Sequence, residues 1–380
     1  MKQLEEFKEV AHCGGQYVVS IKMSDDDHAQ IQLGIRHSRP VPAAFAAVYA
    51  LPQGIPVGTI QLGGIGQPWN PAPFPGCQPI FIASDSHGMF GHQCPGCKGY
   101  WRSKSSPSRW PITCPYCGLR AEMNHFLTEG QLRYLQACCN LIGDAMEAGE
   151  AGEFVIDMDK VADATGKECE KPDFYYAEES QQNNYKCAAC GDINDILGRY
   201  GYCSCCGTFN GITELEKDIE RIKQNIQVGQ EFEAASKDAV GAFDSFSRQI
   251  AKQLVLRVPM TPARQKQWSR KLFHNLASSA NELAAVFDID MFKRMKKEDI
   301  SFAELMFHRR HVYEHNGGEV DDKYIRDSGD TSVRPKQVIR ENRESATRIA
   351  DVVLKLATNL HDGFHQIFSP IKTAVQIHKQ

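Results

Sequence analysis

The chain has 380 residues, a formal net charge of −4 and 42% hydrophobic residues, values typical of a globular protein with two or three domains. Its most apolar run, 43–51, lies between Pro42 and Pro52 and is much shorter than the ~20 residues of a membrane helix, which excludes a spanning segment there. Residues 1–20 lack the apolar centre of a secretory signal, so we expect a cytoplasmic protein with no membrane partner.

Residues 1–90 are predicted to form a β-rich domain. Apolar or alternating segments occur at 17–22, 30–35, 57–62 and 80–83, and turn residues separate them. This pattern favours short strands and points to no particular chemistry.

A helix is predicted between the two cysteine-rich stretches that follow. Thr128 and Gln131 have the spacing of a capping box, which opens a helix ending near Met146. The polar stretch 170–186 is expected to be a loop.

Residues 91–211 contain two modules that each combine two Cys-x-x-Cys pairs. Zinc prefers four thiolates in a tetrahedron, and a Cys-x-x-Cys turn directs two sulfurs towards one ion. The pairs are separated by sixteen residues in the first module and twelve in the second, enough for one β-hairpin each. We therefore predict two zinc ribbons. Their expected ligands are Cys94, Cys97, Cys114 and Cys117 in the first, and Cys187, Cys190, Cys203 and Cys206 in the second.

Disulfides and redox Cys-x-x-Cys motifs are the competing interpretations, and a reducing cytoplasm disfavours disulfides. A four-cysteine site leaves no open position for substrate, so both zinc ions are expected to be structural. Cys205 lies between Cys203 and Cys206, but only those two have the Cys-x-x-Cys spacing, so Cys205 is not an expected ligand. Aromatic residues around the first ribbon are expected to pack against it, although they could stack on bases. These are Tyr100, Trp101 and Trp110.

Residues 212–380 are predicted to form an all-α bundle, which makes the whole chain an α+β multidomain protein. This part holds 27 Lys and Arg against 24 Asp and Glu, a balance that permits an anionic partner without requiring one. Helical spacing of apolar residues and capping patterns define the predicted helices. They run from Thr213 towards Pro259, over 261–287, from Ser301 to about Asn316, and over 335–365.

A cluster of histidines and arginines lies at the predicted end of the third of these helices. His308, His311 and His315 have the spacing of one helical face, with Arg310 beside it. The cluster has three interpretations: a solvated helix end, a metal site, or a site for phosphodiester cleavage. The metal site lacks the Glu that follows the first His in His-Glu-x-x-His zinc enzymes.

The segment Arg310-His-Val-Tyr-Glu-His315 resembles the Arg-x4-His motif of HEPN-domain ribonucleases. The polar residue after the arginine, the helical context and the following Asn-Gly-Gly segment are also similar to that family. The resemblance covers about residues 213–368. It implies metal-independent cleavage of RNA by attack of the ribose 2′-hydroxyl, with His315 transferring a proton and Arg310 stabilising phosphate charge. It also implies that His311 positions this pair or contacts RNA.

The family resemblance further implies a homodimer, whose two motifs face one cleft, and a role as a toxin or antiphage-defence effector. A second hypothesis comes from a different class of protein. In it, the zinc ribbons bind nucleic acid or protein, and the helical bundle is inactive.

Overall fold

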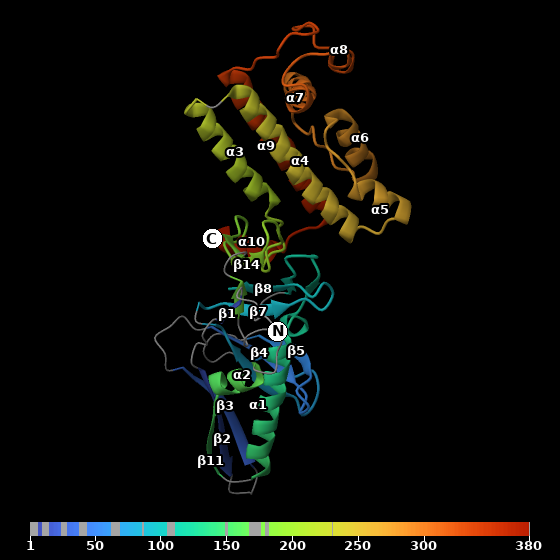
Figure 1. The fold of residues 1–380 in the computed structure, drawn as a ribbon. Coiled ribbons are helices and arrows are strands. Elements are labelled where there is room, and N and C mark those ends of the chain that lie inside the picture. The colour runs from blue at the N-terminus through green and yellow to red at the C-terminus, as the bar shows by residue number, and fades with distance from the viewer. Residues whose placement is uncertain are drawn as a thin grey trace, which may run out of the picture. The chain divides into compact units, whose positions relative to one another are not determined.

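The computed structural model divides the chain into two compact units, residues 1–207 with 371–380, and residues 208–370. Strands dominate the first unit, and the regular elements described in the second are helices (Figure 1). This confirms the expected combination of a β-rich N-terminal region with C-terminal helices. The structure describes residues 7–9, 15–23, 29–37, 44–61, 69–85, 87–104, 111–148, 151–166, 176–178, 182–229 and 231–379.

The first unit is built mainly from short strands. Its strands are β1 (Phe7–Glu9), β2 (Gly15–Met23), β3 (Ala29–His37), β4 (Phe45–Ala50), β5 (Pro56–Ile60), β6 (Gln78–Ala83), β7 (Phe90–Gln93), β8 (Tyr100–Ser103), β9 (Ile112–Thr113), β10 (Arg120–Ala121), β11 (Gly152–Asp157), β12 (Tyr176–Glu178), β13 (Gln182–Lys186) and β14 (Ile193–Leu197). Its helices are η1 (Met123–His125), α1 (Glu129–Glu147), α2 (Met158–Gly166) and α10 (Lys372–Lys379).

The strands pair in antiparallel sheets that join distant parts of the sequence. In one sheet β2 lies between β11 and β3, and in another β4 lies between β5 and β6. A further sheet has the order β13-β14-β8-β7, with β8 from the first cysteine module paired to β14 from the second. The two modules therefore share one sheet.

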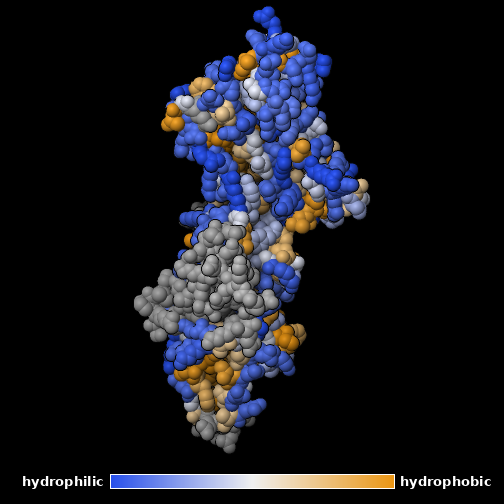
Figure 2. All heavy atoms as spheres, viewed as in Figure 1, coloured by the Kyte–Doolittle hydropathy of each residue, from blue (hydrophilic) through white to orange (hydrophobic). Residues whose placement is uncertain are grey.

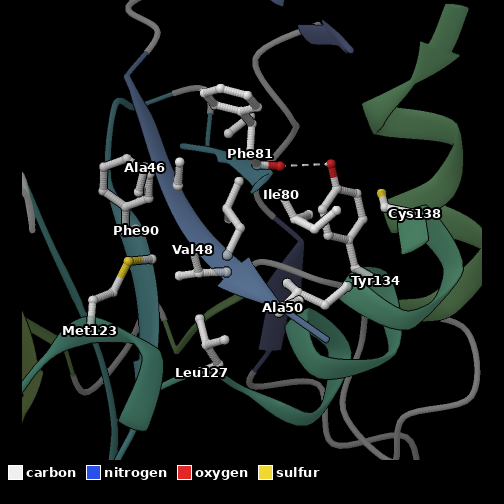
Figure 3. Packing of buried hydrophobic residues seen from close by; sticks show 14 of the residues in the cluster. Ala46, Val48, Ala50, Ile80, Phe81, Phe90, Met123, Leu127, Tyr134 and Cys138 are labelled. Atoms are coloured by element: carbon white, nitrogen blue, oxygen red, sulfur yellow. Dashed lines mark hydrogen bonds between the residues drawn. The ribbon is translucent and has the colours of Figure 1, made fainter. Parts of the chain in front are cut away.

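The core of the first unit surrounds β4, which is apolar along its length and almost completely buried. Figure 3 shows Val48 of this strand among side chains that include Ile80 and Leu127. Tyr134 of α1 reaches the same core, and its hydroxyl donates a 3.0 Å hydrogen bond to the carbonyl of Phe81 (Figure 3). Satisfying this hydroxyl avoids the cost of burying an unpaired polar group.

The sequence-based predictions for this unit are confirmed where local pattern decides the structure. Residues 17–22, 30–35 and 80–83 lie in β2, β3 and β6, and 57–60 lie in β5; Leu62 is outside the described residues. The capping box at the start of α1 is also present.

The loop predicted over 170–186 is wrong in its described part. Residues 176–178 form β12, and 182–186 form β13. These two strands form backbone hydrogen bonds with β1 and β14, respectively. The polar sequence does not indicate this pairing, because it depends on other segments of the chain.

The second unit consists of helices of very different lengths. They are α3 (Gly211–Gln227), α4 (Phe232–Arg257), α5 (Pro262–Ser269), α6 (Leu276–Phe287), α7 (Lys297–His315), α8 (Asp322–Ser328) and α9 (Arg343–Ile367). The long helices α3, α4 and α9 pack against one another, and α7 packs against α4 and α9 (Figure 1).

Several predicted helix boundaries in this unit are wrong. The chain from Thr213 towards Pro259 forms two helices, α3 and α4, which a left-handed glycine, Gly229, separates at φ +94°. The segment 261–287 likewise divides into α5 and α6. Helix α9 begins at Arg343 rather than near Pro335.

Two of the predicted N-terminal caps are also wrong. Helix α3 begins at Gly211, before the expected capping box, and α7 begins at Lys297, before Ser301. A cap found in the structure but not predicted opens α9, where Asn342 and Ser345 form a reciprocal capping box.

Aromatic residues connect the helices of the second unit. Phe243 and Phe246 of α4 are buried, and so is Phe273, which lies between α5 and α6. Phe243 of α4 meets Phe307 of α7 edge-to-face, with ring centroids 5.6 Å apart. This contact packs α7, the helix that carries the histidine cluster, against α4.

The visible face of the helical unit is mostly hydrophilic, with apolar residues scattered among polar ones (Figure 2). Within the described ranges, no helix is both long enough and apolar enough to span a bilayer.

Candidate functional site

The structure brings the eight predicted cysteine ligands together as two separate groups. Within each group, the sulfur atoms all lie within 4.8 Å of one another. Sulfur–sulfur distances include 3.6 Å for Cys94–Cys117, 3.7 Å for Cys97–Cys114, 3.7 Å for Cys187–Cys206 and 3.5 Å for Cys190–Cys203. The twelve cysteines in the described part of the chain are free of disulfides.

The four Cys-x-x-Cys turns have the same backbone geometry. In each, the residue after the second cysteine has a positive φ: Lys98 at 59°, Gly118 at 72°, Gly191 at 74° and Gly207 at 77°. The N–H of that residue donates to the carbonyl of the first cysteine over 2.8–3.0 Å. This tight turn directs both thiols of a pair to the same side.

The cysteine groups fit a tetrahedral metal ion. Zinc–sulfur bonds of about 2.3 Å place the sulfurs of a tetrahedron about 3.8 Å apart, close to the distances found here. Four thiolates are a donor set that zinc takes in structural sites, and they fill its coordination. The geometry is therefore compatible with two bound metal ions, one in each group.

Polar side chains order the second cysteine group. The side-chain NH2 of Asn194 lies 3.5 Å from the sulfur of Cys203, and its carbonyl oxygen accepts a 2.7 Å bond from the N–H of Ser204. Hydrogen bonds of this kind orient ligands and tune the charge on sulfur.

A buried ion-pair network joins the two cysteine modules. Arg102 on β8 lies 2.6 Å from Asp85 and 2.7 Å from Asp195 on β14, and all three side chains are almost inaccessible to solvent. Trp101 beside it is fully buried, and its indole N–H donates to Ser204.

These contacts bear on whether the aromatic residues of the first module pack in the unit or are available to stack on bases. Trp101 and Tyr100 pack inside the unit, as expected, and neither presents a face for base stacking. Trp110 lies outside the described residues.

The last helix, α10, covers the second cysteine group, and nothing in the sequence indicated this. Ala374 packs against the buried cysteines, with Ile371 and Val375 beside it. The N–H of Ile371 donates a 2.8 Å bond to the carbonyl of Cys206. Residues 371–380 were predicted to belong to the helical bundle of residues 212–380. In the structure they belong to the first unit.

The histidine cluster lies in the last two turns of α7, as expected. The helix ends at His315, and the N–H groups of Asn316 and Gly318 donate to the carbonyl of Val312. Gly317 and Gly318 have φ values of 60° and 89°, so glycine permits the chain to leave the helix here.

A cavity of about 340 Å³ opens beside this end of α7 and is called the α7 cavity below. It gathers cations and imidazoles from α7, α8 and the segment before α6. Its polar lining includes His274, His308, Arg310, His311, Asn316 and Lys323. Two carboxylates, Asp321 and Asp327, also line it.

Arg310 is a partly buried cation of the α7 cavity. Its side chain is 14% exposed and lies 2.7 Å from the carboxylate of Glu314, one turn later. Another guanidinium nitrogen lies 3.4 Å from Nε2 of His274, and Nε is buried without a hydrogen-bond partner. The guanidinium is therefore held in place while retaining unused donor capacity.

The structure brings Arg310 and His311 into one cavity but leaves His315 outside its lining. His311 and His315 are in contact, with ring centroids 4.6 Å apart. Burial lowers the pKa of His311, and the charges of His315, Lys323 and Arg310 lower it further, while Asp321 acts in the opposite direction; the net shift favours the neutral imidazole. A neutral imidazole can accept a proton.

The residues that support this site carry no recognisable signal in the sequence. Arg309, next to Arg310, pairs with Asp330 at 3.0 Å and with Glu341 at 2.9 Å. Tyr313 donates to Glu341 and Tyr324 to Asp330, each over 2.6 Å. His274 comes from the distant segment between α5 and α6, and no motif marks it.

No protein-family model, curated protein or solved structure significantly matches this chain. The assignment of a function therefore depends on the residues and geometry described above.

Proposed function

We propose that the second unit is a metal-independent endoribonuclease that uses Arg310, His311 and His315 at the end of α7. The observation that supports it most is the α7 cavity, which combines a partly buried guanidinium with a neutral imidazole. Phosphodiester cleavage by a ribose hydroxyl needs a group of each kind, one to stabilise phosphate charge and one to move protons. The resemblance to HEPN ribonucleases rests on the same residues.

The proposed reaction is a transesterification within the RNA strand. His311 takes the proton of a ribose 2′-hydroxyl, and O2′ forms a bond to the adjacent phosphorus as the bond from phosphorus to O5′ breaks. His315 gives a proton to the departing O5′. Arg310 stabilises the charge on the phosphate oxygens, for which its planar guanidinium is well suited. The products are a 2′,3′-cyclic phosphate and a 5′-hydroxyl.

The proposal includes a homodimer formed through the helical unit. Arg310 and His315 are five residues apart on α7, about 140° around the helix, so one chain presents them in different directions. A second copy of α7 would complete the set of groups around one substrate. Sedimentation at micromolar concentration tests this part, and a monomer there would contradict it.

Both cysteine groups are proposed to hold structural zinc in a cytoplasmic protein, and a role as a toxin or defence effector completes the proposal. Metal analysis of purified protein should give about two zinc ions per chain. Since four thiolates close each site, zinc takes no part in the proposed cleavage.

The test is cleavage of RNA by the wild type and by Arg310→Lys and His315→Asn variants, with excess EDTA and short incubations that limit loss of zinc. We expect cleavage by the wild type with cyclic-phosphate ends. Each variant should lose on the order of 100-fold or more in rate, in the range of a general acid–base or oxyanion contribution.

Matched controls separate catalysis from surface charge. Arg343→Lys and His125→Asn change exposed residues that do not line the α7 cavity and should cleave at the wild-type rate. Equal cleavage by all variants would place the activity elsewhere. No cleavage by folded wild type would favour the second hypothesis, a zinc-ribbon binding protein with an inactive bundle.

A further inference from the structure

A second cavity in the helical unit lies between α4 and the end of α5, and is called the α4–α5 cavity below. It has a volume of about 420 Å³. Four cations line it, namely Arg248, Lys252, Arg270 and Lys271. No Asp or Glu belongs to its lining within the described part of the unit, in contrast to the α7 cavity with its two carboxylates.

The four cations differ in how far acidic groups neutralise them. Arg248 lies 2.7 Å from Asp244, and Lys271 lies 2.5 Å from Glu282. Lys252 and Arg270 are exposed, and neither forms an ion pair among the described residues. These two side chains leave positive charge at a concave surface, where it attracts an anion more strongly than on a flat one.

His274 connects this cavity to the proposed catalytic residues. Its Nε2 lies 3.5 Å from the guanidinium of Arg248, in the α4–α5 cavity, and 3.4 Å from that of Arg310, in the α7 cavity. Asp244 lies 3.6 Å from the same Nε2 and accepts a 3.0 Å bond from the N–H of Phe273. The two cavities thus meet along a continuous row of three basic side chains.

The apolar part of the lining provides little for base recognition. Trp268 is only 2% exposed and packs edge-to-face on Phe287, with ring centroids 4.8 Å apart, so it has no face for a base. Leu272 is 49% exposed at the cavity. Cations without a stacking surface suit the phosphate backbone rather than the bases.

We propose that the α4–α5 cavity binds phosphates of the RNA strand that neighbour the phosphate cleaved at Arg310. This inference rests on the proposed ribonuclease function and adds to it the site that holds the strand. Because Lys252 and Arg270 contact only the backbone, they raise affinity without selecting a sequence. The row from Arg248 through His274 to Arg310 gives the strand its path between the cavities.

The experiment measures binding of a 2′-O-methyl RNA, which cannot undergo the 2′-hydroxyl attack, by fluorescence anisotropy over a range of salt concentrations. We compare the wild type with a Lys252→Gln/Arg270→Gln double variant. At about 100 mM salt the double variant should bind about 10-fold more weakly. The slope of log affinity against log salt should fall by about 1.4, or 0.7 for each lost phosphate contact on a single strand.

The matched control is Arg334→Gln/Arg343→Gln, which removes the same charge from exposed sites outside both cavities. It should bind within two-fold of the wild type with an unchanged salt slope. Equal weakening by both double variants would reduce the effect to net charge and overturn the proposal. Unchanged binding by Lys252→Gln/Arg270→Gln, or no binding by the wild type, would overturn it as well.

Cleavage kinetics distinguish failure of this inference from failure of the nuclease proposal. If the wild type cleaves RNA, Lys252→Gln/Arg270→Gln should raise KM about 10-fold with kcat unchanged, because it removes binding and not chemistry. A fall in kcat at unchanged KM would overturn the binding role. If the wild type binds but does not cleave, the nuclease proposal fails while the anisotropy result still decides the binding site.

Discussion

Arg309 and Arg310 are neighbours on α7, yet their guanidinium groups have different surroundings. Arg309 lies between the carboxylates of Asp330 and Glu341, whose side chains are 3% and 1% exposed. Arg310 pairs with Glu314, which is 40% exposed, and lines a cavity. The first arginine neutralises buried charge, whereas the second is positioned to meet a ligand.

Arg309→Ala should therefore lower the free energy of unfolding by about 3–5 kcal/mol, because it leaves two buried carboxylates without their cation. Arg310→Ala should cost less than about 1 kcal/mol, as expected for a pair with an exposed partner. Urea unfolding of both variants measures the contrast. Similar losses would show that the two arginines have the same structural role.

Lys98 occupies a position that the other three cysteine turns give to glycine. Its φ of 59° is left-handed, which costs a residue with a Cβ about 1–2 kcal/mol, while glycine would lose more entropy on folding. Lys98→Gly should therefore stabilise the first unit by roughly 0.5–1 kcal/mol. Chemical unfolding at fixed zinc concentration is the measurement.

Lys104→Gly is the matched control for this substitution. Lys104 is exposed, directly follows β8 and is absent from the residues with positive φ. The same change there should destabilise the protein slightly. Stabilisation at both positions would mean that losing the lysine, and not relieving the backbone, causes the effect.

The local sequence pattern was sufficient to predict the cysteine groups, because each Cys-x-x-Cys pair forms a turn of its own. The positions of Cys94 and Cys97 fix one turn, and the repeat of this spacing predicts its partner. Arg310 and His311 were found in the same way, on one helix. His274 could not be found, since its place beside Arg310 depends on how α5 and α6 pack.

At the scale of elements, two histidines on α9 hold the segment that leads into α3. Nε2 of His361 donates to the carbonyl of Phe209, and Nε2 of His365 accepts from the N–H of the same residue, each over 3.1 Å. His365 then donates from Nδ1 to the carbonyl of Phe368 over 2.9 Å. Both hydrogen-bonding groups of Phe209 are thus paired with imidazoles.

This arrangement predicts a pH dependence for the helical unit. Burial lowers the pKa of His361, and its bond to Phe209 and the charge of Asp362 offset this only in part. Because the unfolded chain binds a proton below pH ~6.5 more readily than the folded one, stability should fall as pH drops below that value. Thermal unfolding followed by helical circular dichroism between pH 7.5 and 5.5 measures it.

His361→Gln removes the titrating group and keeps an N–H donor. This variant should show a shallower fall in Tm over the same range of pH. An unchanged slope would assign the pH dependence to other groups.

The elements that sequence analysis misjudged are those whose formation depends on distant partners. The polar strand β13 forms because β14 supplies its ladder. Helix α10 is amphipathic, but nothing local indicates that its apolar side meets Cys205 and Cys206. The break between α3 and α4 had a local signal in Gly229, which the continuous helical spacing obscured.

At the scale of the whole molecule, the first unit is made of two stretches of chain. It includes residues 1–207, and the chain returns to it at residue 371. Cys206 and Ile371 are joined by a backbone hydrogen bond, so the two ends of the intervening segment lie side by side within the first unit.

Replacing residues 208–370 with a short Gly-Ser linker should therefore leave the first unit folded. We expect the shortened protein to bind about two zinc ions per chain and to show no RNA cleavage. Zinc stoichiometry and the thermal unfolding profile are the measurements. Binding of one zinc or none would show that the first unit depends on residues 208–370.

The return of the chain at Ile371 also sets an order of events during synthesis. The eight cysteines leave the ribosome early, but the helix that covers the second group follows only after the entire segment 208–370. Until α10 (Lys372–Lys379) has been synthesised, Cys205 and its neighbours lack its cover. A nascent chain that stops before residue 371 would therefore leave these thiols without the cover of α10.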